Sequence, residues 1–165
     1  MRQFKTFAAF PLIVLGIFLA CDRRNTTPKN AAPTNTETIN LSPVIHSGQT
    51  QVFREVKQVT LLPGSVLDQL GAIADPARPF NATDVVDRKL PMQQLIVAGV
   101  SEKYCIVSYW RGGIVLALRT NIFQLSEGKA KLILVSNGQG GLNFRDLKDM
   151  VESGRIDNDM STSKH

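Results

Sequence analysis

The hydrophobic residues of this chain form one continuous run near its start and shorter, interrupted groups farther along. Residues 7–20 are an unbroken apolar stretch of about 14 residues, which is the length of the apolar part of a signal peptide. As a helix this stretch would rise roughly 21 Å, whereas a bilayer core needs about 30 Å. The run therefore predicts an export signal rather than a permanent membrane span.

The middle of the chain alternates short apolar runs with turn residues. The runs are rich in Val, Ile, Leu and aromatic residues, and they cover 94–100, 104–110, 114–119, 122–125 and 131–135. Short connections such as Ser101-Glu102-Lys103 and Arg111-Gly112-Gly113 are typical of hairpin turns. Residues 51–62 fit a helix or a strand, and their β-branched content favours a strand. Successive short strands with short connections predict an antiparallel meander.

Two segments have the spacing of amphipathic helices, and residues 75–88 between helix and strands are predicted to be a loop. The first helix is predicted after Ser65, which resembles an N-cap, and before Pro76. The second is predicted between Asn143, as N-cap, and Gly154. The predicted fold class is therefore α+β, a small antiparallel β-meander with two helices packed on one face.

Composition divides the chain into four parts. We expect a signal peptide at 1–20, a tether at 21–43, a globular α+β domain at 44–156 and a flexible tail at 157–165. The tether is rich in Asn, Thr and Pro and has little to bury, so it cannot offset the entropy of ordering and is predicted to be disordered.

The end of the apolar run is the most specific motif in the chain. Phe18-Leu19-Ala20-Cys21 resembles the lipobox of bacterial lipoproteins, although Phe18 stands where leucine is commonest in that family. The resemblance covers residues 1–22 and implies cleavage before Cys21, with lipid attached to its sulfur and commonly to its amine. Several acyl chains give stable anchoring, which a single chain does not. Asp22 resembles the inner-membrane retention signal of some Gram-negative lipoproteins.

The lipoprotein resemblance implies a protein attached to a membrane outside the cytoplasm. The site would be the periplasmic side of the inner or outer membrane, or the outer face of a single membrane. The net charge of +5 includes Arg2 and Lys5 of the expected signal peptide, so the rest of the chain is only mildly basic. Aromatic residues make up 7% of the chain. Neither feature is typical of a nucleic-acid-binding protein, so no nucleic-acid partner is predicted.

No catalytic, cofactor-binding or metal-binding constellation is predicted. If Cys21 carries lipid, Cys105 has no partner within the chain, and we expect it to be a structural thiol in a strand. The two histidines, His46 and His165, are poorly placed to serve as a base or as metal ligands. Asp84 and Asp87 could form an acid–base pair, but with Arg88 and Lys89 directly after them a solvated turn with local ion pairs is the favoured interpretation.

The segment 136–143, Ser-Asn-Gly-Gln-Gly-Gly-Leu-Asn, follows a predicted strand and opens a helix, as a phosphate-binding loop does. It departs from the dinucleotide fingerprint at Asn143, and it lacks the lysine–hydroxyl pair of a Walker motif. It is therefore predicted to be a flexible connection, with a weak anion site at the helix N-terminus as the alternative.

The residues most typical of a contact surface are Tyr109, Trp110 and Arg111. The leading hypothesis is a non-enzymatic envelope module that binds a partner protein or acts as an accessory subunit, through the hairpin around residues 109–113. The alternatives are an envelope hydrolase with dispersed site residues and a carrier of a small apolar ligand. A cleft lined by Asp84, Asp87 or the Gly138 loop would count against the leading hypothesis, whereas a shallow exposed apolar patch would favour it.

Overall fold

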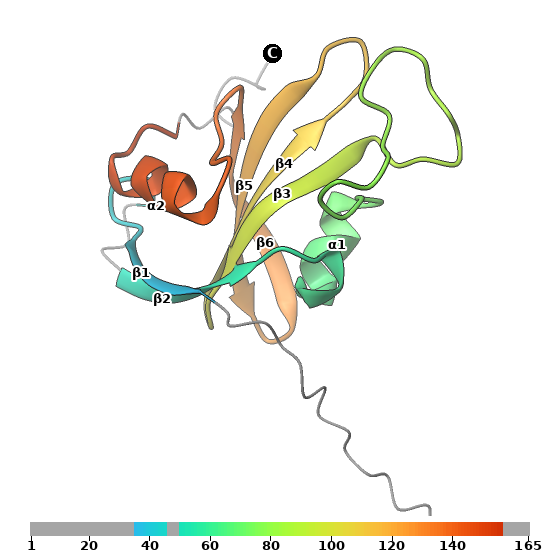
Figure 1. Ribbon diagram of the computed structural model, residues 1–165. Helices are drawn as coiled ribbons and strands as arrows, with labels where there is room; N and C mark the ends of the chain where they lie inside the picture. The colour runs from blue at the N-terminus through green and yellow to red at the C-terminus, as the bar shows by residue number, and fades with distance from the viewer. Residues whose placement is uncertain (1–34, 46–49, 157–165) are drawn as a thin grey trace, which may run out of the picture. The chain divides into compact units, whose positions relative to one another are not determined.

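The computed structural model describes residues 35–45 and 50–156, which form a six-stranded antiparallel sheet with two α-helices (Figure 1). The strands lie side by side in sequence order: β1 (Thr36–Asn40), β2 (Thr50–Val56), β3 (Gln93–Val100), β4 (Tyr104–Arg111), β5 (Ala117–Ser126) and β6 (Lys129–Asn137). The helices are α1 (Gly64–Leu70) and α2 (Phe144–Glu152), and a 3-10 turn, η1 (Val59–Leu61), precedes α1. The predicted α+β meander is confirmed.

The two helices do not share a face of the sheet, so the prediction that both pack on one face is wrong. Side chains alternate between the two faces along β4: Ile106 belongs to one hydrophobic cluster, whereas Cys105 and Val107 belong to the other. The first cluster includes residues of α2, and the second includes residues of α1. Both faces of the central strands are buried, which is why β4 is almost uniformly apolar.

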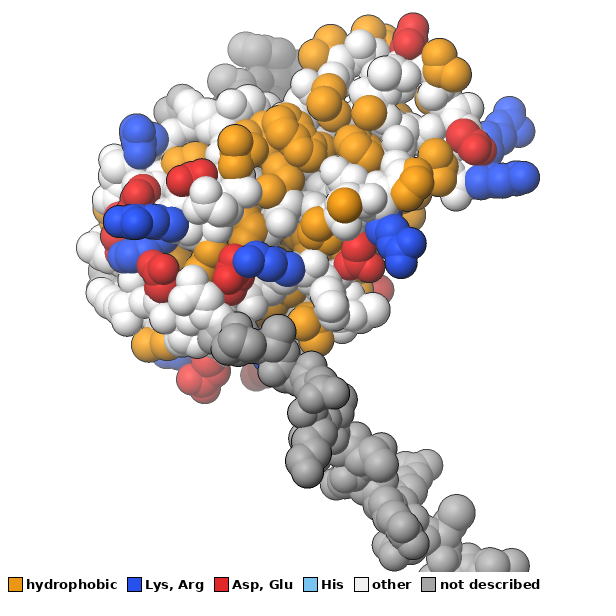
Figure 2. All heavy atoms as spheres, in the orientation of Figure 1, with side chains coloured by type: hydrophobic (Ala, Val, Ile, Leu, Met, Phe, Trp, Pro, Cys, Tyr) orange, Lys and Arg blue, Asp and Glu red, His pale blue; other side chains and the backbone are white. Residues whose placement is uncertain are grey.

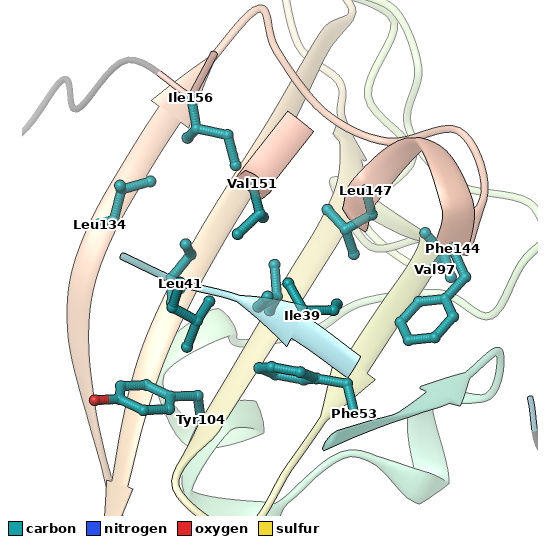
Figure 3. Close-up of a cluster of buried hydrophobic side chains, with 12 residues drawn as sticks. Ile39, Leu41, Phe53, Val97, Tyr104, Leu134, Phe144, Leu147, Val151 and Ile156 are labelled. Atoms are coloured by element: carbon teal, nitrogen blue, oxygen red, sulfur yellow. The ribbon is translucent and has the colours of Figure 1, made fainter. Parts of the chain in front are cut away.

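The α2 face holds the larger cluster, which β1 and α2 enclose together. Figure 3 shows Ile39 of β1 beside Leu147 and Val151 of α2 above the sheet. Phe53 of β2 and Phe144 of α2 complete this cluster, and both are buried. Burying side chains of this size stabilises the fold by roughly 1.5–3 kcal/mol each.

The predicted boundary between tether and domain at residue 43 is wrong. Thr36–Asn40 forms an edge strand that pairs with β2, and the adjacent Leu41, like Ile39, has no exposed surface. The segment was predicted to be tether because most of its neighbours are polar. Ile39 and Leu41 pack into the hydrophobic cluster under α2, and the backbone of the strand pairs with β2.

Two local predictions also need correction. The runs at 114–119 and 122–125 belong largely to one strand, β5, which begins at Ala117 and leaves Ile114–Leu116 in the preceding loop. The first helix starts at Gly64, with Pro63 and not Ser65 at the N-cap position, and it ends before Gly71. The strand expected within 51–62 is confirmed as β2.

Helix α2 has the ends that the sequence predicts. The Asn143 side chain accepts a hydrogen bond from the Asp146 backbone N–H at 2.9 Å, which caps the helix. At the other end Gly154 has a φ of 67°, and the backbone N–H of Arg155 donates to the carbonyl of Met150. This Schellman-type turn folds the chain back over the last turn of the helix.

Candidate functional site

The three most exposed large apolar side chains among the described residues, Ile114, Val85 and Val115, lie in two loops at one end of the sheet. Ile114, Val115 and Leu116, in the β4–β5 loop, are 94%, 73% and 45% exposed. Val85 and Val86, in the long loop before β3, are 80% and 54% exposed. We call these five residues the apolar tip. In Figure 1 both loops lie at the upper right.

Asn81 holds the Val85–Val86 loop in shape. Its carboxamide nitrogen donates to the carbonyls of Asp87 and Leu90 at 2.9 and 2.8 Å, and its oxygen accepts from the Asp87 N–H at 2.8 Å. The side chain is 4% exposed, so these bonds are shielded from water. One buried amide thereby replaces the backbone ladder that this loop lacks.

The two loops are also packed against each other. A Cβ on Gly112 would lie 1.6 Å from the carbonyl oxygen of Asn81, so only glycine allows the two backbones to approach this closely. The N–H of Gly112 donates to the carbonyl of Met92 at 2.8 Å, and the N–H of Asn81 donates to that of Pro91. The apolar tip is therefore built on a braced support rather than on two independent loops.

Charged residues of both signs surround the tip. Asp84 and Asp87 flank the two valines, Arg88 and Lys89 follow them, and Arg111 ends the strand before Ile114. Figure 2 shows hydrophobic side chains at the upper right of the molecule, with acidic and basic groups beside them. An apolar centre with a charged rim is the usual composition of a protein–protein contact.

The tip and the start of the described chain lie at opposite ends of the sheet. Thr36 pairs with Arg54, and Arg54 pairs with Val100 beside the β3–β4 turn. The β4–β5 loop follows Arg111, at the other end of β4, about 23 Å away along the strand. A domain held through its N-terminal strand would thus present the tip away from the point of attachment.

The three predicted contact residues differ in their exposure to solvent. Tyr109 is 3% exposed and belongs to the cluster under α1, so the prediction that it lies on a contact surface is wrong. Trp110 points to the α2 face, where it lies opposite Leu118 and is half-buried, and Arg111 is exposed at the end of β4. The exposed apolar residues of this hairpin lie in its loop, at Ile114–Leu116, and not in its strand.

A groove of about 510 Å³ lies on the α2 face. It is lined by Leu118, Gly138, Gln139, Gly140, Met150 and Arg155. The Gly138 loop therefore lines a groove. A cleft at this loop is the feature expected to count against a purely protein-binding role. Its lining side chains include no carboxylate, thiol, hydroxyl or imidazole, so they do not provide the nucleophile or base of a hydrolase.

The other candidate groups have structural surroundings. Cys105 is fully buried, and this burial raises the pKa of its thiol from 9.0 to about 12, which disfavours the reactive thiolate. The Asp87 carboxylate accepts a hydrogen bond from the backbone N–H of Lys89 at 2.9 Å, as expected of a turn. Cys21, His46 and His165 lie outside the described residues. Among those described, no group of three or more His, Cys, Asp or Glu side chains could hold a metal ion.

The start of α2 is occupied by its own cap. The Asn143 side chain accepts from the N–H of Asp146 and donates to the Asp146 carboxylate at 2.7 Å. This carboxylate occupies the end of the helix that would attract an anion. The segment 138–143 is thus the strand-to-helix connection that its sequence predicts.

Sequence reasoning missed Asn81 and Gly112. Asn81 was visible only within a chance glycosylation triplet, Asn81-Ala82-Thr83, and its place in the middle of a Pro-containing loop was the available signal for a loop-organising amide. The Gly112-Gly113 pair indicated a turn, but its contact with residue 81 is a tertiary feature that no local pattern reports.

Comparisons with protein-family models, curated proteins and solved structures find no match for this chain. Over the ranges 35–45 and 50–156, no helix is long and apolar enough to cross a membrane.

Proposed function

We propose that this protein is a bacterial lipoprotein, anchored outside the cytoplasm by lipid on Cys21, whose domain binds an envelope protein through the apolar tip. The lipobox-like Phe18-Leu19-Ala20-Cys21 supports the anchor. The segment between Cys21 and Asn35 would span up to about 50 Å when extended, which leaves the domain room to reach a partner.

The observation that best supports a binding role is that five aliphatic side chains are exposed on two loops held in place by hydrogen bonds and close backbone packing. An exposed side chain adds little to folding stability, and apolar residues gathered in one place mark contact sites or aggregation risks. Here Asn81 and Gly112 hold the loops together, so the surface is organised before any partner arrives. A pre-organised surface loses less entropy on binding.

A protein partner is favoured over a lipid surface by the position of the tip. The chain enters the domain at the opposite end of the sheet, so a domain standing on its anchor would direct Val115 away from the bilayer. The charged groups around the tip carry both signs, whereas binding to anionic lipid depends on a clear basic excess.

Site-specific photocrosslinking in intact cells tests the binding role. A photoreactive residue at Val85 or at Val115 should give a product with the same polypeptide, and one at exposed Glu102, on the opposite β3–β4 turn, should not. Replacing Ile114 and Leu116 with Ser should reduce crosslinking from Val85 several-fold. Products formed mainly with lipid, or identical products from Glu102, would contradict the proposal.

Metabolic labelling tests the anchor separately. The wild-type chain should incorporate labelled fatty acid, and Cys21→Ser should not, whereas the matched Cys105→Ser variant should be labelled like wild type because its thiol is buried. Absence of label from the wild-type chain would refute the lipoprotein assignment and leave the tip experiment interpretable.

A further inference from the structure

The groove on the α2 face is formed by two segments that turn back on themselves. On one side, the N–H of Gly138 donates to the carbonyl of Leu118 at 2.7 Å, which places the glycine loop beside the start of β5. On the other side, the positive φ of Gly154 returns Arg155 to Met150, to which it is bonded through its backbone. Met150 and Arg155 therefore face Leu118 and the loop across the groove.

The side chains of the groove have two distinct characters. Leu118 and Met150 provide an apolar wall, and methionine adapts its shape to irregular ligands. Among the described residues that line the groove, Arg155 is the only charged one. Its Nε donates to the Ser153 hydroxyl at 2.8 Å, and it forms no ion pair within the described chain. Its remaining guanidinium N–H groups can thus donate to an anion.

A row of small polar side chains lies on the sheet next to the glycine loop. Ser108, Thr120 and Ser136 face one another across β4, β5 and β6, and all three are fully buried. Thr120 donates to the carbonyl of Gln139 at 3.0 Å, whereas the hydroxyls of Ser108 and Ser136 have no hydrogen-bond partner in the described chain. A buried hydroxyl without a partner is unfavourable, so this end of the α2 face is not an ordinary apolar core.

Gly140 separates this row from the groove by backbone alone. A Cβ at Gly140 would lie 2.7 Å from both the Ser108 hydroxyl oxygen and the Leu118 Cγ, so the loop rests directly on the strands. The groove is therefore bounded by apolar side chains, a polar backbone loop and one cation. Its volume is about 510 Å³, and it is open to solvent, so a ligand would lie along the surface of the α2 face.

We propose that this groove binds a small anionic amphiphile of the fatty-acid class. The alkyl chain would lie along Leu118 and Met150, and the carboxylate would accept hydrogen bonds from Arg155. The inference requires neither lipid on Cys21 nor a partner at the apolar tip, because all of its lining residues lie elsewhere in the chain.

Photolabelling of the purified full-length protein tests this site. The probe is dodecanoate carrying a diazirine, and labelled peptides are mapped by mass spectrometry. Label should fall on peptides containing Leu118 or Met150, and unlabelled dodecanoate should compete about ten-fold better than dodecanol, which has the same chain and no charge.

Two matched arginine variants decide the role of the cation. Arg155→Gln should remove the advantage of dodecanoate over dodecanol, whereas Arg145→Gln, at an exposed arginine in the first turn of α2, should retain it. Both positions are exposed, so neither change is expected to unfold the domain. Equal competition by the two ligands in the wild type, label outside the groove, or equal effects of the two variants would each overturn the proposal.

Discussion

At the scale of single residues, the buried side-chain amide of Asn81 fixes the shape of one of the two loops that form the apolar tip. Asn81 touches none of the apolar tip residues through a hydrogen bond, yet its side chain bonds across the loop to the backbone of Asp87 and Leu90, which follow Val85 and Val86. Each side-chain bond of this kind contributes about 0.5–1.5 kcal/mol, and a buried group left unpaired costs about 1–3 kcal/mol.

We therefore expect Asn81→Ala to lower the free energy of unfolding by about 2–3 kcal/mol and to increase amide hydrogen exchange across residues 82–91. Asn81→Asp should recover little, because a carboxylate cannot donate to the carbonyls of Asp87 and Leu90. The control is Arg88→Ala, an exposed change in the same loop. Exchange that rises equally in Arg88→Ala would show that Asn81 does not organise the loop.

At the scale of elements, α2 protects the free edge of β1. Lys148 Nζ donates to the carbonyl of Thr38 at 2.9 Å, and the N–H of Asn40 donates to the Glu152 carboxylate at 3.0 Å. Lys148 and Glu152 also form an ion pair at 2.8 Å. The helix thus occupies backbone groups to which another strand could otherwise bind.

This arrangement makes stability depend on pH. Burial raises the pKa of the Glu152 carboxyl, but its hydrogen bonds with Lys148 and Asn40 and the charge of Lys148 outweigh that effect and lower the pKa below 4.5. A carboxyl with a lower pKa in the folded state stabilises the fold above its unfolded pKa, and that contribution is lost as pH falls through the folded value.

Urea unfolding between pH 7 and pH 3 should therefore show a loss of stability in the wild type, near and below pH 4.5, that is smaller in Glu152→Gln. The effect should be modest, about 0.3–1 kcal/mol, because the pair is partly exposed. The glutamine retains an acceptor for the Asn40 N–H, so it isolates the charge. A constant difference between the two proteins across this range would exclude the ion pair as the cause.

At the scale of the whole molecule, the sheet places the first described strand and the apolar tip at opposite ends. The described chain begins at β1 on one side and presents the apolar tip beyond the far end of β4. The first strand is part of the core rather than of the tether, because Ile39 and Leu41 have no exposed surface. Removing this strand should therefore lower the free energy of unfolding of the domain.

A variant that lacks residues 1–34 should unfold cooperatively, and one that lacks 1–43 should be unfolded or markedly destabilised. The shorter variant loses β1 and two buried side chains worth roughly 1.5–3 kcal/mol each, a large part of the 5–15 kcal/mol typical of a domain. Circular dichroism and thermal unfolding measure the difference. Equal melting temperatures would show that β1 is dispensable.

The sequence by itself determined the class of fold and most of its elements. Short β-branched runs separated by Gly and charged turns can form little but an antiparallel meander, and Asn143 and Gly154 mark the ends of α2 through local chemistry. These features depend on neighbours a few residues apart, so a single sequence contains them. The lipobox resemblance at Cys21 is local in the same way, and the lipid there stays a prediction.

Only the tertiary structure decided which faces the helices cover, where the domain begins and which residues form the site. Whether a side chain is buried depends on what packs against it. Tyr109 is buried by elements distant in the chain. Ile114 is exposed because β5 begins at Ala117 and not at residue 114, as predicted. The approach of Gly112 to Asn81 and of Arg155 to Leu118 joins segments far apart in the chain. Long-range packing sets these distances, and no local pattern encodes them.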